Sequence, residues 1–594
     1  MGELSRFKIS HFLIVLILVL GVFVRLNGLG EAPLSDTEAR VALQARALAG
    51  GGAYGGSGTH AGAVALTGLV FFIFGDTDFL ARLVPALAGV LLVAAPWVLR
   101  GRIGEGPALV AAAGLAIDPL LVGVSRLADG PMLAAGPLFL AISLRIANTG
   151  EGGANGRILT GVLAGLAILA GPGAWLGLLI LLLVWIAGRF AGIRTETGVD
   201  RAAFGREAAA FGITAAIVGT LFMQAPEGVG ALAGGLGAFL QGWISPQAVP
   251  AVRLLIGLAG YHGLVILLAG AYSWRMRASA PPAIRVLWLL AVAALTLVVL
   301  YPGRQVADLV WVVTPLWLLA GSQIAEKIAV GPVPAYRPAL LAGVLVTLAA
   351  SFWVNLAALF NAISIDPNLW LRVLVITGTL VLAGLAILLV GMGWDSVSAR
   401  TGSMWALSVL LVFGMLHGFL GGAPSGRRDL WQPAPAAGEA ARLKETIREL
   451  GGWTRGETAS LDVTLTTESP AAAWALRRFP NLTYGGGFSR DSLPSIVVTE
   501  GDGGDFRFTS SYRGQGLAWR VNVRWDEMTG RDWLGWMLFK EAPAATEQIV
   551  IWARADLFLT GGELVVEDPL DTIEDGEQEE IIPIDDPEDL FPGG

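Results

Sequence analysis

The stretch Pro33-Leu34-Ser35-Asp36-Thr37-Glu38-Ala39-Arg40 follows the first apolar segment of the chain, which runs roughly from Ile9 to Val24. A simple membrane anchor would continue with a bland turn, whereas this stretch carries two carboxylates and a guanidinium. Ionisable groups held against a bilayer cost free energy unless they pair or line an aqueous cavity. The cluster is therefore the first candidate for a functional site.

The composition indicates a polytopic membrane protein. Hydrophobic residues make up 54% of the 594 residues, charged residues 15%, and the mean hydropathy is +0.64. The chain has no cysteine, which excludes disulfides, thiolate metal sites and cysteine nucleophiles, and its four histidines indicate no histidine-rich metal site. We expect no resident cofactor; a divalent cation is possible, but the sequence does not indicate one. The first apolar segment lacks a small-residue cleavage site and is expected to be a retained helix.

Apolar segments of nearly the length needed to cross a bilayer recur along the chain. They lie near residues 9–26, 80–99, 107–124, 131–147, 158–172, 174–190, 208–223, 251–272, 286–301, 307–323, 338–360, 370–393 and 403–420. The sequence thus predicts about thirteen transmembrane helices. A shorter apolar stretch, 61–74, decides the orientation of every later loop.

Basic residues resolve the orientation, because short cytoplasmic loops carry the excess of Lys and Arg. If 61–74 lies in the membrane interface, one set of alternate loops contains most of the loop arginines, and the N-terminus with Arg6 and Lys8 lies on the same side. We therefore expect 61–74 to be an interfacial helix, the N-terminus to be cytoplasmic, and the protein to lie in the plasma membrane. The opposite, external face then collects the polar segments of the chain: the first loop (27–79), Ser125 to Asp129, Gly171 to Gly173, the long loop 224–250, Tyr301 to Arg304, the segment near Asp366, and everything after residue 421.

The order of several short motifs resembles the GT-C superfamily of lipid-linked-sugar glycosyltransferases, and within it the protein O-mannosyltransferase and lipid A aminoarabinose transferase type. That family has an Arg-Leu at the end of the first helix, an acidic pair before an Ala in a large first external loop, a Phe-Gly turn, an Arg-Leu-x-Pro-Ala-Leu start to the second span, and a Ser-Arg after the third. The matching residues are Arg25-Leu26, Glu38-Ala39, Phe74-Gly75, Arg82 to Leu87, and Ser125-Arg126. The resemblance covers about residues 9–420. No single motif is specific to the family, whereas the order of the motifs is.

Two departures from the family pattern stand out. The adjacent Asp-Glu of the family is split here as Asp36-Thr37-Glu38, so either carboxylate is a candidate for the catalytic position. Where relatives carry Pro-Pro-Leu, this chain has Ser57-Gly58-Thr59-His60-Ala61. The second change is expected to alter acceptor preference or to accompany decayed activity.

The resemblance implies a transferase that moves a sugar from a polyprenyl-phosphate donor to a protein, lipid or envelope-glycan acceptor on the external face, without nucleic acid. An incoming hydroxyl needs a general base, which Asp36 or Glu38 would supply. A departing phosphate needs positive charge, and the planar guanidinium groups of Arg126 and Arg304 suit it. The supporting or acceptor-side candidates are His60, Asp129, Asp308 and Trp311.

Each candidate also has a plain structural interpretation. Asp36 would be the N-cap of an interfacial helix with acidic charge in its first turn. Arg126 would pair with Asp129 at i+3, and Arg304 with Asp308 at i+4. The alternative function is a non-catalytic GT-C-like accessory for lipid-linked sugar flipping or envelope assembly. A secondary transporter would need ionisable residues at mid-span and inverted repeats, and the sequence shows neither.

The region after the last span changes character. Residues 422–562 are expected to form a small soluble α/β or α+β domain, with strands at 461–466 and 495–499 and a helix at 470–478. Its tryptophans, including Trp519 and Trp536, favour a core over a carbohydrate platform. Residues 563–594 are rich in Asp, Glu, Pro and Gly and predict an acidic disordered tail. The transmembrane domain is expected to span 1–421.

Overall fold

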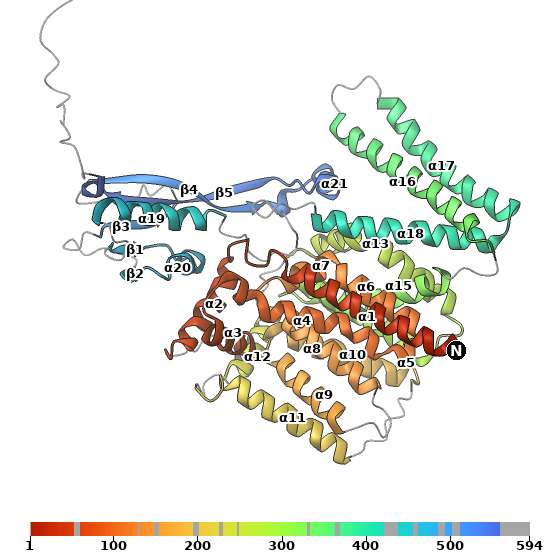
Figure 1. The fold of residues 1–594 in the computed structure, drawn as a ribbon, viewed down its shortest axis with the longest axis horizontal. Coiled ribbons are helices and arrows are strands. Elements are labelled where there is room, and N and C mark those ends of the chain that lie inside the picture. The colour runs from red at the N-terminus through yellow and green to blue at the C-terminus, as the bar shows by residue number, and fades with distance from the viewer. Residues whose placement is uncertain are drawn as a thin grey trace, which may run out of the picture.

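The fold is a large helical bundle with a small sheet-containing region at its C-terminal end (Figure 1). The computed structural model describes residues 2–52, 60–128, 131–147, 154–193, 201–224, 230–245, 249–328, 333–362, 369–420, 430, 438–455, 461–484, 494–501 and 511–558. The predicted acidic tail lies outside the described residues, as does Asp129.

All thirteen predicted apolar segments fall on helices. They are α1 (Gly2–Leu26), α4 (Asp78–Val98), α6 (Glu105–Ile117) with α7 (Pro119–Ser125), α8 (Pro131–Ala147), α9 (Ala154–Ile168), α10 (Pro172–Phe190), α11 (Arg201–Gly219), α13 (Ala251–Met276), α14 (Pro282–Leu300), α15 (Val310–Ile328), α16 (Tyr336–Ala362), α17 (Leu369–Gly393) and α18 (Ser396–Leu420). Within the described ranges nine helical segments are long and apolar enough to cross a membrane, and α6 with α7, bent by 58°, would be a tenth. The chain is a multi-pass membrane protein, and the count of thirteen stays a prediction.

The first loop folds into two short helices, α2 (Asp36–Ala49) and α3 (Ala61–Phe74). Fourteen residues of helix extend about 21 Å, which is less than the ~30 Å hydrocarbon core of a bilayer. The first half of α3 is buried against the protein, whereas Leu69, Phe72 and Phe74 near its end are exposed. This length and this exposed apolar end agree with the predicted interfacial position.

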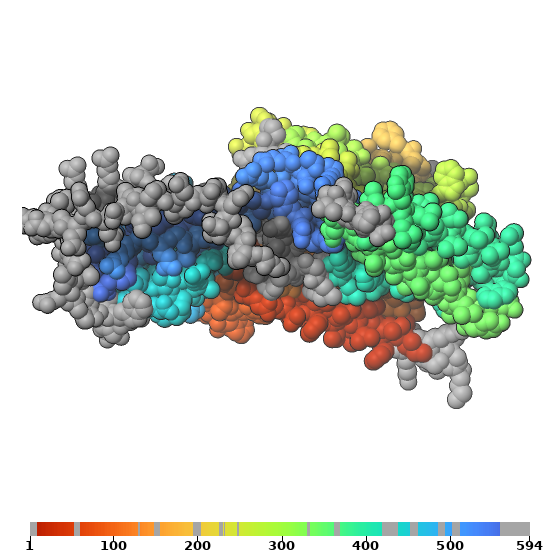
Figure 2. All heavy atoms as spheres, turned by 90° about the horizontal axis from the view of Figure 1, so that it is seen from above, coloured from red at the N-terminus to blue at the C-terminus, as the bar shows by residue number. Residues whose placement is uncertain are grey.

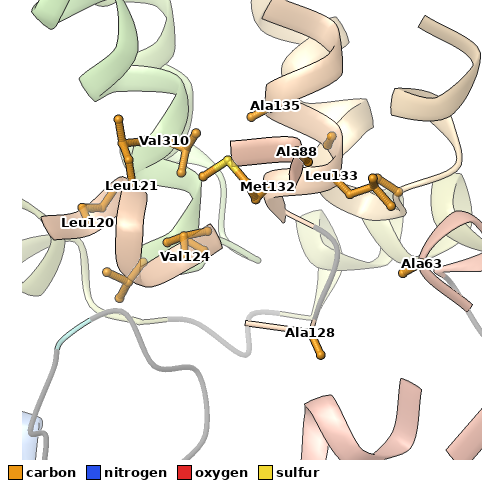
Figure 3. Close-up of a cluster of buried hydrophobic side chains, with 14 of the residues drawn as sticks. Ala63, Ala88, Leu120, Leu121, Val124, Ala128, Met132, Leu133, Ala135 and Val310 are labelled. Carbon is orange, nitrogen blue, oxygen red and sulfur yellow. The ribbon is translucent and has the colours of Figure 1, made fainter. Parts of the chain in front are cut away.

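Small residues let the bundle helices approach closely. A Cβ atom at Gly136 of α8 would lie 2.0 Å from the carbonyl oxygen of Ala88 in α4, and one at Gly114 of α6 would lie 2.2 Å from the ring of Trp317 in α15. Such contacts are typical of membrane bundles, where packing replaces the hydrophobic effect between helices. Figure 3 shows the core beside the α7 loop, where Leu121, Met132 and Val310 converge.

The C-terminal region contains a five-stranded sheet. Its elements are α19 (Ala440–Arg455), β1 (Val463–Leu465), α20 (Pro470–Leu476), β2 (Leu482–Tyr484), β3 (Ile496–Glu500), β4 (Tyr512–Val523), α21 (Gly530–Phe539) and β5 (Ala544–Arg554). The strand order is β2-β1-β3-β5-β4, with β1 parallel to both of its neighbours and β5 antiparallel to β3 and β4. The two predicted strands and the predicted helix are confirmed. Trp519 and Trp536 are buried, as expected of core residues.

This region contacts the bundle at two separate places (Figures 1 and 2). At one end α20 packs on the first loop, where Trp474 stacks on Phe71 of α3 with ring centroids 5.8 Å apart. At the other end α21 packs on α13, where the ring of Trp536 meets that of Tyr261 at 5.1 Å. The long antiparallel pair β4–β5 joins the two ends, so the C-terminal region lies across one face of the bundle.

Candidate functional site

Helix α2 begins at Asp36, and its N-cap is Ser35. The expected N-cap role of Asp36 is therefore wrong by one residue. Glu38 at the third helical position accepts hydrogen bonds from the backbone N and the Oγ of Ser35, at 2.9 and 3.0 Å. Ser followed three residues later by Glu is the capping-box pattern, which explains why the helix starts here.

Glu38 forms a buried ion pair with Arg82 of α4. Arg82 Nε lies 2.7 Å from Oε1 of Glu38, and Nη2 lies 2.9 Å from Oε2. The backbone N of Ala128, in the loop after α7, also donates to Oε1 at 3.0 Å. Arg82 uses its remaining donors on the carbonyl oxygens of Leu29, Ala32 and Pro33. One carboxylate thus ties together the first loop, α4 and the loop that carries Arg126.

The ionisation of Glu38 follows from these contacts. Burial acts to raise its pKa, but the charge of Arg82 and hydrogen bonds from Arg82, Ser35 and Ala128 outweigh burial and hold the pKa below its usual value. Glu38 is therefore a carboxylate at neutral pH. Both of its oxygens accept hydrogen bonds and 2% of the residue is exposed, so Glu38 acts as an anchor that holds neighbouring segments together.

Asp36 turns in a different direction, toward the C-terminal region. Its Oδ1 accepts hydrogen bonds from the Oγ of Ser469 at 2.7 Å and from the backbone N of Ala471 at 2.9 Å, and its carboxylate pairs with Arg520 of β4. Residues i and i+2 of a helix lie about 200° apart around its axis. Because Thr37 separates the two acids, Glu38 points into the bundle and Asp36 points toward the sheet. About 20% of the Asp36 side chain is exposed.

Arg126 closes the end of the first helix. Its Nη1 donates to the carbonyl oxygens of Val24 and Asn27 at 3.1 and 2.8 Å, and its Nη2 to that of Gly28 at 2.9 Å. The last carbonyls of a helix carry partial negative charge, which suits a guanidinium. Since the backbone N of Ala128, two residues later, donates to Glu38, the structure brings Arg126 and Glu38 to one end of the bundle.

Arg304 contacts a different group of residues. Its Nε donates to the carbonyl oxygen of Val249 at 2.8 Å, and its Nη1 to those of Val299 and Tyr301 at 3.1 and 3.0 Å. Asp308 instead accepts from the backbone N of Gln305 at 2.8 Å, so the i+4 pair expected of these two residues is not formed. Across the described ranges no hydrogen bond or ion pair links Arg304 to Asp36, Glu38 or Arg126.

The other two described candidates lie in packed surroundings. His60 is the residue before α3, and burial lowers its pKa to about 4, so its imidazole is neutral at physiological pH. Trp311 is 4% exposed and packs on Phe139, with ring centroids 5.4 Å apart, and on the face of Gly177. No group of three His, Asp or Glu suited to hold a metal occurs in the described part of the chain.

The structure also contains ionisable residues inside the bundle, which the sequence interpretation missed. Asp118 caps α7 through the backbone N of Leu121 at 3.0 Å, and its Oδ2 lies 2.8 Å from Nε2 of His262 and accepts from Nε1 of Trp317 at 2.7 Å. The expectation of no ionisable residue at mid-span is therefore wrong. Asp118-Pro119 within an apolar segment was a readable helix-break signal, because Asp is a good N-cap and Pro suits the first helical position.

Two basic residues that hold the acids were also missed. Arg82 belongs to the Arg-Leu-x-Pro-Ala-Leu motif, which by itself indicates no partner for it. Arg520 lies more than 480 residues from Asp36 in the sequence. An inward-facing acid beside a membrane span needs a cation, so the Arg82 partner could have been inferred from burial cost. Nothing in the local sequence of Arg520 indicates its target.

Comparisons with known proteins find similarity in structure but not in sequence. Neither a protein-family model nor a curated protein matches the sequence. The structure is similar to that of ArnT from Cupriavidus metallidurans bound to undecaprenyl phosphate, with a TM-score of 0.53, 16% identity, and coverage of 91% of this chain and 97% of that one. The apo form of the same protein matches with a TM-score of 0.50 and 15% identity over the same shares.

A weaker match is the oligosaccharyltransferase of Archaeoglobus fulgidus, with a TM-score of 0.41, 12% identity, and coverage of 83% of this chain and 69% of that one. ArnT and this enzyme are members of the GT-C superfamily. The ArnT likeness extends over nearly the whole of both chains. The predicted resemblance is confirmed at the level of the fold: the chain shares the overall fold of ArnT, a member of the GT-C superfamily.

Proposed function

We propose that this protein is a membrane glycosyltransferase that moves a sugar from a polyprenyl-phosphate donor to a hydroxyl acceptor. The observation that carries the proposal is the GT-C architecture combined with an acidic residue, Asp36, that is only partly buried at the start of the first juxtamembrane helix. ArnT, the relative in fold, binds undecaprenyl phosphate in its solved structure. A donor of the same class fits the apolar bundle of this chain and the arginines at its loops.

In the proposed reaction Asp36 is the general base. It takes the proton of the acceptor hydroxyl, the hydroxyl oxygen bonds to the anomeric carbon of the sugar, and the bond from that carbon to the phosphate oxygen breaks. Polyprenyl phosphate leaves with the electron pair. Asp36 suits this role better than Glu38, because about 20% of the Asp36 side chain is exposed, whereas Glu38 is 2% exposed and binds Arg82, Ser35 and Ala128 inside the protein.

Glu38 and Arg82 are then positioning residues, since their pair fixes the loop of Arg126 against the first loop. Arg126 and Arg304 remain the proposed donor-phosphate ligands. For Arg304, Nη2 binds no carbonyl or carboxylate in the described ranges, so two N–H donors are available to a phosphate. The proposed site lies on the external face, with the N-terminus cytoplasmic.

The test uses the full-length protein in lipid nanodiscs with a polyprenyl-phosphate hexose. Donor consumption is compared between wild type and the variants Asp36→Asn, Arg126→Ala and Arg304→Ala. We expect Asp36→Asn to lower the turnover at least 100-fold with donor affinity preserved, and the arginine variants to weaken donor binding. Unchanged turnover in all three variants would overturn the assignment, and donor binding without any turnover by wild type would favour the non-catalytic accessory.

A further inference from the structure

The helical hairpin of α16 and α17 lies at the edge of the bundle, beside α18 (Figure 1). Helix α16 packs on these neighbours with one face, where Leu341, Ala342 and Leu345 are buried. The opposite face carries an open groove of about 580 Å³. Every residue that lines this groove belongs to α16, between Tyr336 and Leu348.

Small residues form the floor of the groove. Ala339, Gly343 and Thr347 recur at every fourth position, which places them in one row along the helix. A Cβ atom at Gly343 would have no packing neighbour within 4 Å among the described residues. The hydroxyl of Thr347 donates to the carbonyl oxygen of Gly343 at 2.9 Å, so this row exposes no unpaired polar side chain. Leu340 and Val344, both exposed, line the groove beside the row. The groove therefore suits a hydrocarbon chain.

The groove is about as long as one leaflet of a bilayer is thick. From Tyr336 to Leu348 the helix rises about 18 Å, at ~1.5 Å per residue. Half of the ~30 Å hydrocarbon core is about 15 Å. Tyr336 at the start of α16 and Trp394 directly after α17 are exposed, and their rings pack edge to face with centroids 6.3 Å apart. Tyr and Trp at the ends of spans mark the level of the lipid head groups. We call this end of the groove its mouth.

Arg337 supplies a positive charge at the mouth. Its guanidinium carbon lies 5.7 Å from the ring centroid of Trp394, and 31% of its side chain is exposed. Its Nη1 lies 3.4 Å from Oδ2 of Asp395, a carboxylate that also accepts hydrogen bonds from the backbone N and the hydroxyl of Ser398. Its Nε donates to no described acceptor. The guanidinium thus has donors left for a phosphate, which arginine binds through parallel N–H groups.

A helix from a second copy of the chain is the other occupant that a row of small residues can accept. Two copies related by a two-fold axis along the membrane normal would pair this face with itself, so identical residues would meet. The two copies of Arg337 would then face each other, and like charges at short range repel. An anionic lipid instead places a negative charge beside Arg337.

We propose that the groove on α16 binds an acyl chain of an anionic phospholipid, whose phosphate pairs with Arg337 at the mouth. The lipid belongs to the leaflet at the start of α16, which is the predicted cytoplasmic one. None of the groove residues belongs to the first loop or to the C-terminal region, where sugar transfer is proposed. The inference is therefore independent of the proposed function.

The test measures lipid binding to the detergent-solubilised full-length protein by native mass spectrometry. The probes are palmitoyl-oleoyl-phosphatidylglycerol, which is anionic, and palmitoyl-oleoyl-phosphatidylcholine, which has the same chains and no net charge. Gly343→Leu fills the groove, and Gly384→Leu, at an exposed position of α17, is its control. Arg337→Gln removes the charge at the mouth, and Arg285→Gln, at an exposed position in the first turn of α14, is its control.

We expect wild type to bind phosphatidylglycerol at least fivefold more tightly than phosphatidylcholine. Gly343→Leu should weaken phosphatidylglycerol binding at least fivefold. This variant should keep the fold, because the added side chain meets open space and Leu favours a helix over Gly. Arg337→Gln should bind the two lipids alike, since the charge is lost while the groove remains. Both control variants should stay within twofold of wild type for each lipid.

Equal affinity of wild type for the two lipids would overturn the inference, as would equal effects of Gly343→Leu and Gly384→Leu. Displacement of phosphatidylglycerol by glycerol phosphate alone would also overturn it, because the acyl chain would then add nothing to binding. Dimers of wild type that Gly343→Leu dissociates would assign the groove to a second copy of the chain instead of a lipid.

Discussion

Arg520 of β4 pairs with Asp36 of α2, so that the last region of the chain holds the acid that follows its first membrane helix. The same guanidinium donates to Ser469 Oγ at 2.9 Å and lies 3.2 Å from Glu547. The position of Asp36 is therefore fixed by contacts with the C-terminal region, which is distant from it in the sequence. A carboxylate held in this way has a fixed direction, which the proposed general base would require.

The Arg520 contact gives the first prediction. Arg520→Met removes the charge but keeps much of the side-chain volume, so the Asp36 carboxylate loses the contact that orients it. We expect donor turnover to fall about tenfold with donor affinity unchanged. Turnover and donor Kd are measured on the same nanodisc samples. Arg524→Met, directly after the same strand, is the control and should leave turnover unchanged, because among the described residues this arginine pairs with the exposed Glu527.

The buried pair of Glu38 and Arg82 gives a prediction about stability. Removing one member leaves an uncompensated charge inside the protein, which costs about 3–5 kcal/mol. Glu38→Ala should therefore lower the Tm of the detergent-solubilised protein strongly. Arg448→Ala breaks an exposed pair with Glu445 and should change the Tm little, because exposed pairs contribute about 0–1 kcal/mol. Equal Tm shifts for the two variants would contradict the assignment of Glu38 as an anchor.

Low pH should act through the same carboxylate. The pKa of Glu38 is lowered in the folded protein, so the pair contributes stability above the unfolded pKa of about 4.3, and this contribution is lost as the pH falls through the folded value. We expect the Tm of wild type to fall on acidification below about pH 4.5. The Tm of Glu38→Gln should start lower and depend less on pH over the same range. Parallel curves for the two proteins would show that other groups govern the acid response.

How far the sequence predicts this structure depends on the range of the interaction. The apolar segments predict most of the bundle helices, because a membrane span needs a continuous run of apolar residues and that run is local. They miss α12 (Gly230–Ile244), which lies in the stretch expected to be a long external loop. The capping pattern of Ser35 and Glu38 and the strands at 463–465 and 496–500 are local as well. The ion pairs Asp36–Arg520 and Glu38–Arg82 join residues far apart in the chain, and single-sequence patterns carry no signal for such partners. The sequence pattern does not single out Asp118 for a different reason: one polar residue hardly changes the mean hydropathy of a span.

The docking of α20 on the first loop supports a further prediction. Asp76 pairs with Arg46, Arg477 and Arg478, and Asp78 accepts a hydrogen bond from Nε1 of Trp474. The Asp76 pKa is lowered, since the charges and hydrogen bonds of these arginines outweigh the opposing effect of partial burial. Asp76→Asn should loosen the contact between α20 and α3, and hydrogen exchange should increase in α20. Exchange in α21, which contacts the bundle at the other end, should stay as in wild type.

The buried cluster around Asp118 yields the last prediction. Its carboxylate serves three groups on three helices, the backbone N of Leu121, the ring of His262 and Nε1 of Trp317. Asp118→Ala leaves these buried polar groups without an acceptor, at about 1–3 kcal/mol for each. Trp317→Phe removes one donor and keeps most of the ring, so its cost should be nearer 1 kcal/mol. Because α7 leads into the loop of Arg126 and Ala128, Asp118→Ala should also weaken donor binding, while Trp317→Phe should leave it nearly intact. The two variants are compared by Tm and by donor Kd, and equal effects on both quantities would mean that Asp118 does not position the loop.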